Sequence, residues 1–240
     1  MRNLHPVKAK DKTPVVYAEW RWRLLESLRE RGLQLLQALE SLEQQPLIIG
    51  SVARGDVSPS SDVDVYLLGY IPSWRVALCL ENAGFEVKVY KIVQATPQTA
   101  LRFIAVLDEK VEVSVPISKL KRTEEEFPRY AGAVSTREIL EKIRVRGVNK
   151  RLLFIEPTSY GHDEWSVMGR ENEVAELLGV SLQTVLEREA MRSKRAREGK
   201  TGFYFYAEVP GEESPEDFIC QAARRNPSIR ETVAETLNCY

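Results

Sequence analysis

The residues best suited to chemistry are two aspartates that lie two positions apart, Asp62 and Asp64. From Asp62 to Leu67 polar and apolar residues alternate, which predicts a half-buried strand with both carboxylates on one face. Their Cα atoms would lie about 7 Å apart, because a strand rises roughly 3.3 Å per residue. Two carboxylates this close repel each other and need a cation. Oxygen ligands at this spacing suit Mg²⁺, and a metal pair about 3.5–4 Å apart would serve phosphoryl transfer.

A glycine–serine turn precedes the aspartates. The short apolar run 47–49 predicts a buried strand that ends at Gly50, and Ser51 follows it. Glycine lets the backbone approach a ligand closely, and N–H groups at the turn, with the Ser51 hydroxyl, can hold phosphate oxygens. Arg54 lies close enough to add a positive charge. A lone Asp-x-Asp often matches by chance, but here turn, spacing and strand coincide, which favours a binding site over an ordinary acidic strand face.

The stretch GSVARGD at 50–56, followed by SDVDV at 61–65, resembles the fingerprint of the polymerase-β-like nucleotidyltransferase superfamily, especially its minimal archaeal and bacterial members. The likeness covers about residues 35–118. It implies transfer of a nucleoside monophosphate from a nucleoside triphosphate, with ATP favoured, to an acceptor hydroxyl. It also implies two Mg²⁺ ions held by three carboxylates. By this resemblance Gly50 and Ser51 bind the triphosphate, while Asp62 and Asp64 hold the metals.

The third carboxylate expected from this resemblance is Glu112. Residues 111–116 alternate as a strand does, with Glu112 and Ser114 on one face. The family places its third carboxylate between hydrophobic residues on a strand, usually as aspartate, and glutamate is one methylene longer. A register two residues later would place Ser114 at the position of the third carboxylate. Glu86, on the preceding strand, is the alternative candidate for that carboxylate. The third carboxylate matters because it can ligate a metal beside the acceptor hydroxyl and help to remove its proton.

A second functional region begins after a charged stretch at 116–132, which predicts a domain boundary. Residues 171–188 predict a helix-turn-helix of the winged type, with Gly179 at the turn. The second helix would run to Glu198, and residues 201–206 would form the wing strand. Two basic segments, Lys142–Arg151 and Arg188–Lys200, could contact nucleic acid or simply be solvated helix surfaces.

Composition narrows the remaining choices. The chain has 240 residues and a net charge of −1, so any contact with nucleic acid must come from local patches. Cys79, Cys220 and Cys239 show no metal-ligand spacing, so neither zinc nor disulfides are expected. Neither His5 nor His162 has recognisable catalytic or metal-binding partners in the sequence. The absence of a long apolar run or a signal-peptide pattern predicts a cytoplasmic protein that does not enter a membrane.

The sequence therefore predicts an α/β (α+β) fold, with a small mixed sheet and flanking helices of the nucleotidyltransferase type plus a mainly helical, winged helix-turn-helix-like C-terminal domain. The expected ranges are 1–118 for the N-terminal helix and transferase domain, 119–150 for a linker and helix, and 151–240 for the C-terminal domain. The predicted function is Mg²⁺-dependent nucleotidyl transfer, with nucleic acid favoured as acceptor. The alternatives are a non-catalytic nucleic-acid-binding regulator with a degenerate transferase site, and a protein adenylyltransferase. Oligomeric state is left open.

Overall fold

A computed structural model describes residues 5–8, 10–199 and 202–239. The chain belongs to the mixed α and β class, as the sequence predicts. It divides into two compact units: unit 1 comprises residues within 1–31, 48–62 and 122–201, and unit 2 comprises residues within 32–47, 63–121 and 202–240. These units interleave along the chain, in contrast to the consecutive ranges that the sequence predicts. Within the described ranges no helix combines the length and apolarity that a membrane crossing requires.

Each unit contains both helices and strands. Helix α1 (Glu19–Ala38) and strand β2 (Leu47–Ile49) have residues in both units. The other elements of unit 1 are β1 (Thr13–Val16), α2 (Ser51–Arg54), α4 (Arg122–Glu125), α5 (Phe127–Ala131), β7 (Ala133–Val134), α6 (Thr136–Leu140), β8 (Gly147–Val148), β9 (Leu153–Thr158), β10 (Gly161–Ser166), α7 (Glu171–Leu178) and α8 (Leu182–Glu198). Those of unit 2 are β3 (Val63–Tyr66), α3 (Ser73–Asn82), β4 (Val89–Gln94), β5 (Arg102–Asp108), β6 (Val111–Pro116), β11 (Phe205–Pro210), α9 (Pro215–Arg225) and α10 (Pro227–Val233).

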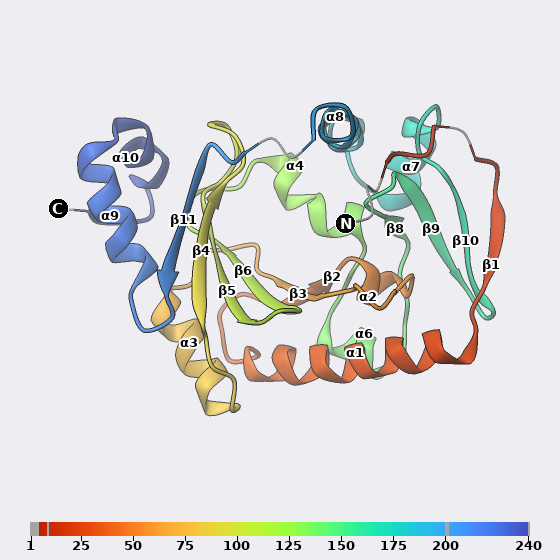
Figure 1. Cartoon of the computed structure of the whole chain (residues 1–240), viewed down its shortest axis with the longest axis horizontal. Coiled ribbons are helices and arrows are strands. Elements are labelled where there is room, and N and C mark those ends of the chain that lie inside the picture. Colours follow the sequence, from red (N-terminus) through yellow and green to blue (C-terminus); the bar gives the residue numbers. More distant parts are fainter. Residues whose placement is uncertain (1–4, 9, 200–201, 240) are drawn as a thin grey trace. The chain divides into compact units, whose positions relative to one another are not determined.

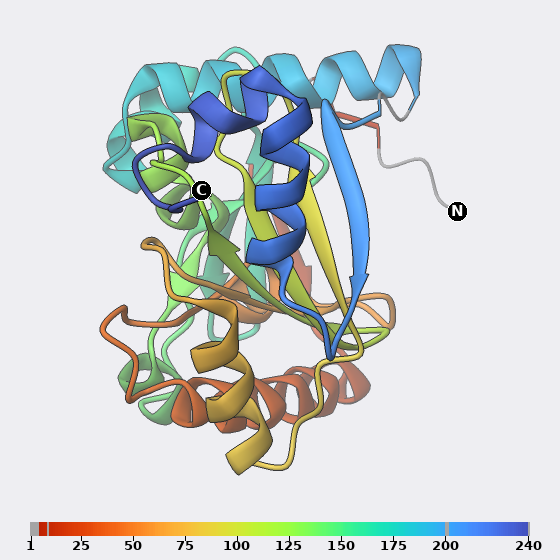
Figure 2. The same cartoon turned by 90° about the vertical axis from the view of Figure 1, so that its left-hand side faces the viewer.

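Unit 2 is built on five neighbouring strands in the order β11-β4-β5-β6-β3. Strands β3 and β6 run parallel, and the other neighbours pair antiparallel. Because side chains alternate along each strand, one face carries fully buried residues such as Tyr90, Phe103 and Val113. Helices α3, α9 and α10 cover this apolar face, as both views show (Figures 1 and 2). The opposite face is the more polar and more exposed one, and it carries the residues of the candidate site.

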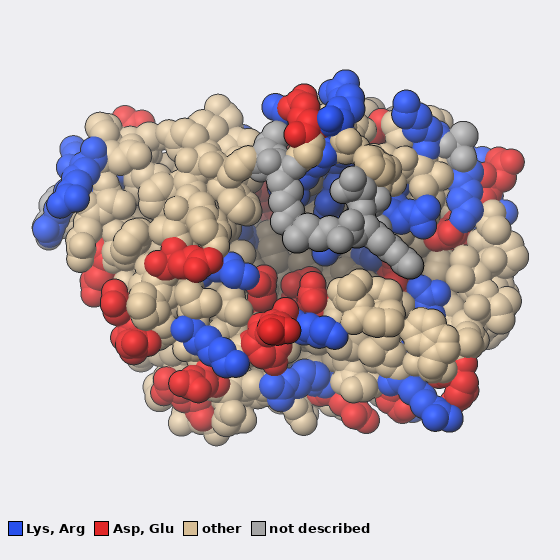
Figure 3. Space-filling model, viewed as in Figure 1, with Lys and Arg blue, Asp and Glu red and all other residues tan. Residues whose placement is uncertain are grey.

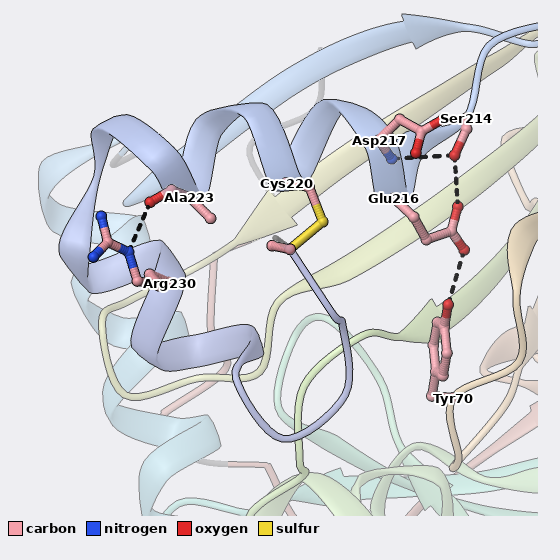
Figure 4. The surroundings of a disulfide bond; sticks show 8 residues. Tyr70, Ser214, Glu216, Asp217, Cys220, Ala223 and Arg230 are labelled. Atoms are coloured by element: carbon pink, nitrogen blue, oxygen red, sulfur yellow. Dashed lines mark hydrogen bonds between the residues drawn. A yellow bond between two sulfur atoms is a disulfide. The ribbon is translucent and has the colours of Figure 1, made fainter.

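Glu216 of α9 links this helix to the start of α3 through hydrogen bonds. Its carboxylate accepts hydrogen bonds from the Ser73 N–H at 2.7 Å and from the Tyr70 hydroxyl at 3.2 Å. Figure 4 shows the second of these contacts beside the disulfide of the same helix. Burial, and then the carboxylate of Glu216, raise the pKa of Tyr70. This polar link holds the helical layer against the apolar face of the sheet.

Unit 1 contains a second sheet, which is wholly antiparallel and has the strand order β1-β10-β9-β8. Strand β2 pairs antiparallel with β7. The core beside this sheet packs Phe154 and Trp165 against residues of α5, α7 and α8, including Tyr130, Val174 and Val185. Aromatic stacking contributes here, because the Phe154 and Trp165 rings lie 4.3 Å apart between centroids. The two helices α7 and α8 are therefore held as part of a packed core.

The two helices and the turn predicted for residues 171–188 are present as α7, Gly179 and α8. Helix α7 ends at Gly179, whose φ of 60° is left-handed, and the Ser181 hydroxyl caps the N-terminus of α8 by accepting from the Thr184 N–H. Helix α8 reaches Glu198, as predicted. The predicted wing is wrong, because the strand that follows α8, β11, pairs with β4 in unit 2. Of the residues assigned to the second basic segment and the wing, Lys200 and Thr201 lie outside the described residues.

The expectation that the chain has no disulfide is also wrong, because Cys220 and Cys239 are bonded. Pro227 begins α10 directly after α9, and the two helices pack together, which returns the chain towards Cys220 (Figure 4). Disulfides are rare in most cytoplasmic proteins, but those of hyperthermophiles retain them. The cytoplasmic location stays a prediction.

Replacing Cys220 with serine should lower the free energy of unfolding by about 3 kcal/mol, because the bond closes a loop across a sequence separation of 19 residues. Urea unfolding under oxidising conditions measures the change. Cys79→Ser is the matched control, since Cys79 is free and half-buried. Equal transition midpoints for oxidised and dithiothreitol-reduced wild-type protein would show that the bond contributes nothing.

Candidate active site

The centre of the candidate site is the pair Asp64 and Glu112 on the polar face of the unit 2 sheet. Strands β3 and β6 are adjacent and parallel, and their register places Asp64 directly opposite Glu112. Both residues are half-buried, while their neighbours Val63, Val65 and Val111 point into the core. Adjacent strands lie about 4.8 Å apart, so the two carboxylates are placed side by side on one face. The register thus puts Glu112 beside Asp64, while its role as the third carboxylate of a metal site stays a prediction.

The alternative register, which would place Ser114 opposite Asp64 as a replacement for the third carboxylate, is not observed. Ser114 pairs with Tyr66 instead, one step further along the two strands. Its hydroxyl accepts a hydrogen bond at 2.8 Å from Nε of Arg102, whose Nη1 donates to the Tyr66 hydroxyl at 2.9 Å. The same guanidinium lies 4.0 Å from the centroid of the Tyr66 ring. Ser114 is therefore part of a buried arginine network beside the carboxylates, and it does not replace Glu112.

Glu112 has a cationic partner, Lys91 of β4. The Lys91 Nζ lies 2.5 Å from Glu112 Oε1, and both side chains are partly exposed. The lysine reaches across β5, which separates β4 from β6 in the sheet. Glu86, the alternative third carboxylate, lies three residues before β4 and is exposed. The structure therefore places Glu112, and not Glu86, beside Asp64.

Asp62 belongs to unit 1 and immediately precedes β3. It is half-buried, and the preceding Ser61 hydroxyl accepts a hydrogen bond from the Ser58 N–H at 2.9 Å. That bond closes the turn from which the strand emerges. Strand β3 therefore begins one residue after Asp62 and carries Asp64 alone, in contrast to the prediction that both aspartates lie on one strand.

The glycine–serine turn lies in unit 1. Gly50 has a φ of 81° and a ψ of −141°, a conformation that side chains other than glycine rarely adopt. Its N–H donates to the Gly132 carbonyl at 2.9 Å, so this amide is already used. The Ser51 hydroxyl donates to the Ser61 hydroxyl at 3.1 Å. The turn has the conformation that the sequence predicts, with Ser51 as its polar side chain.

Arg54 is placed differently from the expectation that its charge serves a ligand. It is 4% exposed, and its guanidinium forms an ion pair with Asp56, with Nη2 and Oδ1 2.9 Å apart. Its Nη1 also donates to the carbonyls of Ala131 and Val148. These contacts favour a structural role in which Arg54 holds the segment after the turn. The spacing of Asp56, two residues on, is the sequence signal that could have indicated this pair.

Sequence reasoning missed a buried network around His162. The imidazole Nδ1 lies 2.6 Å from the Tyr17 hydroxyl, and Nε2 lies 3.4 Å from Glu164 Oε2. Contact with His162, opposed by burial, lowers the pKa of Glu164 to about 2, and Lys10 adds to the effect. Strand alternation could have placed His162 and Glu164 on one face, but Tyr17 joins them only because β1 pairs with β10.

The donor set at the candidate site has the chemistry that a hard cation requires. Asp64 and Glu112 offer carboxylate oxygens from one face, and the Lys91 ammonium shows that this position attracts positive charge. Among the described residues, however, no group of three or more histidine, cysteine, aspartate or glutamate side chains is gathered as a metal site. Asp64 and Glu112 are oxygen donors of the kind that Mg²⁺ prefers, but a metal at this position, and Asp62 as a third ligand, stay predictions.

Comparison of the chain with protein-family models, with curated proteins and with solved structures gave no match.

Proposed function

We propose that the protein is a Mg²⁺-dependent nucleotidyltransferase that moves a nucleoside monophosphate from a nucleoside triphosphate, with ATP favoured, to an acceptor hydroxyl. The observation that carries this proposal is the placement of Asp64 opposite Glu112 on the exposed face of a sheet. The glycine–serine turn at Gly50 and Ser51 supports it, because a turn of this kind can hold phosphate oxygens.

In the proposed reaction the acceptor hydroxyl attacks the α-phosphorus, the bond from that phosphorus to the bridging oxygen breaks, and pyrophosphate leaves. Ser51 holds phosphate oxygens through its hydroxyl, and Gly50 lets the backbone approach them closely. Glu112 helps to remove the proton from the acceptor hydroxyl. Held by Asp62, Asp64 and Glu112, two Mg²⁺ ions would offset phosphate charge and lower the pKa of the acceptor hydroxyl. The chain itself contributes mainly position and electrostatics.

Nucleic acid is the favoured acceptor because of α8. On the side of the molecule that Figure 3 draws, basic and acidic side chains are interspersed, so binding must rely on local groups. In the first basic segment, Lys142–Arg151, the Arg144 guanidinium donates to the Thr158 and Gly161 carbonyls, and Arg146 pairs with Glu156 at 2.6 Å. Those two cations already have protein partners. In the second segment, Arg188–Lys200, Lys194 pairs with Glu198, but Arg192 and Arg195 make no ion pair among the described residues, so this segment is the better candidate.

A labelling experiment tests the proposal. The protein is incubated with each of the four nucleoside triphosphates, labelled at the α-phosphate, together with Mg²⁺ and total cell extract. We expect label in RNA or DNA, and label in protein would instead identify the adenylyltransferase alternative. Absence of label with all four nucleotides, with Mn²⁺ as well as Mg²⁺, would refute transfer.

The ion pair of Lys91 with Glu112 also favours a second candidate, a nucleic-acid-binding regulator whose transferase site has decayed. If the Lys91 ammonium permanently neutralises the Glu112 carboxylate, no metal ion is needed at that position. Mg²⁺-dependent binding of nucleoside triphosphate separates the candidates. The enzyme should bind both ligands cooperatively, whereas the regulator should bind nucleic acid regardless of either.

Replacing Lys91 with methionine should increase the affinity for Mn²⁺, because the ammonium competes with the metal for Glu112. We expect about a two- to fivefold change, since a partly exposed ion pair is worth roughly 0.3–1 kcal/mol. Titration of Mn²⁺ followed by electron paramagnetic resonance measures it. Lys88→Met, at an exposed position before the same strand, is the control. Equal Mn²⁺ affinity in both variants would argue against Glu112 as a ligand.

A further inference from the structure

Three arginines of α8 lie on one face of the helix. Arg188, Arg192 and Arg195 follow one another at steps of four and three residues, which places neighbouring side chains on the same side. All three are half-buried. Arg188 lies over the Phe127 ring of α5, 4.1 Å from its centroid, so this face of α8 is turned towards α5. The helix therefore presents three guanidinium groups to one partly enclosed region of unit 1.

The same region contains a buried hydroxyl that has no hydrogen-bond partner. Tyr130 lies three residues after Phe127 on α5 and is 4% exposed, and its Oη is buried without a partner among the described residues. A buried hydroxyl left unpaired costs about 1–3 kcal/mol. Burial raises the pKa of Tyr130, and the positive charges of Arg188 and Arg192 oppose this rise most strongly. Tyr130 and Arg188 therefore both pack at α5, in the same part of unit 1.

Two of the three arginines, Arg192 and Arg195, have no acidic partner at ion-pair distance among the described residues. Burial, and then the nearby charges of Arg195 and Arg188, lower the pKa of Arg192. Glu189 also lies near Tyr130, but it shares a hydrogen bond with Glu171, and burial raises its pKa. Like charges that lose solvent destabilise one another unless an anion offsets them.

We infer that Arg188, Arg192, Arg195 and the Tyr130 hydroxyl form a binding site for a phosphate group. Guanidinium groups pair with phosphate oxygens in two-pronged contacts, and the tyrosine O–H supplies one further donor. This site would be the place on α8 where nucleic acid binds. Only the identity of the ligand rests on the proposed function. The phosphate belongs either to a nucleic-acid backbone or to a free triphosphate.

Binding measured without metal tests the site apart from the transfer reaction. The probes are a fluorescein-labelled single-stranded RNA of about 20 nucleotides, followed by anisotropy, and inorganic tripolyphosphate, followed by calorimetry, both in EDTA. Arg192→Gln should weaken binding about tenfold or more, because a charge-assisted hydrogen bond is lost. The matched control is Arg197→Gln on the same helix, since nine residues from Arg188 place Arg197 on the opposite, exposed face.

Tyr130→Phe provides a second readout that does not depend on charge. It should weaken phosphate binding severalfold, yet leave the unliganded protein as stable as wild type or more stable, because an unpaired hydroxyl is removed. If Arg192→Gln fails to fold, Arg195→Gln takes its place. Asp64→Asn should leave this binding unchanged, so a failed transferase proposal is distinguishable from a failed phosphate site.

Binding of RNA alone would identify a backbone phosphate, and binding of tripolyphosphate, with competition between the two, would identify a free triphosphate. Either result supports the site. The inference is overturned if wild-type protein binds neither probe, or if Arg192→Gln and Arg197→Gln weaken binding equally, because the effect would then be general charge.

Discussion

Replacing Asp64 with asparagine should reduce nucleotide transfer by about a thousandfold, because removal of one electrostatic contact in a phosphoryl-transfer site has effects of this order. Asparagine keeps the size of the side chain and its place opposite Glu112 but removes the charge that would hold a cation. Asp62→Asn should have a comparable effect if both aspartates are ligands. Incorporation of α-labelled nucleotide into RNA measures the activity, and thermal unfolding checks the fold.

The control for this prediction is Glu109→Gln. Glu109 is an exposed carboxylate in the turn between β5 and β6, in the same sheet, and its loss should leave transfer unchanged. Mn²⁺ binding provides a readout apart from turnover, since Asp64→Asn should weaken it and Glu109→Gln should not. Full activity in both Asp62→Asn and Asp64→Asn would refute the metal assignment.

Local patterns predicted the parts of the fold that local physics decides. Alternation along 63–66 and 111–116 gave the faces of β3 and β6, because side chains in a strand point alternately to its two sides. The helix-turn-helix was predictable because its boundaries depend on neighbouring residues, Gly179 at the end of α7 and Ser181 at the start of α8.

Features that depend on the order of strands were not predictable. Lys91 contacts Glu112 only because β4 lies two strands from β6, and nothing near Lys91 in the sequence indicates this. The strand after α8 was expected to be a wing, since its sequence does not identify β4 as its partner. The bond between Cys220 and Cys239 likewise follows from the packing of α9 with α10.

Replacing Glu126 with alanine should lower the free energy of unfolding of the chain by about 4 kcal/mol, because two buried donors would lose their acceptor. The Glu126 carboxylate, which is 4% exposed, accepts a hydrogen bond from the Ser181 N–H at 2.8 Å and another from the Thr184 hydroxyl at 2.6 Å. It also offers negative charge to the N-terminus of α8. Guanidinium unfolding followed by circular dichroism measures the loss, and the exposed neighbour Glu125→Ala is the control.

The same residue predicts how stability depends on pH. Burial alone would raise the pKa of Glu126, but hydrogen bonds from Ser181, Thr184 and Arg122 outweigh burial and lower it from 4.5 to about 2. Because the folded pKa is the lower one, the unfolded chain binds more protons between these values, so stability falls as pH falls. The stabilisation is complete above about pH 4.5 and is lost towards pH 2. Glu126→Gln, which cannot ionise, should therefore lose less stability than wild type over this range, and parallel losses in both proteins would contradict the assignment.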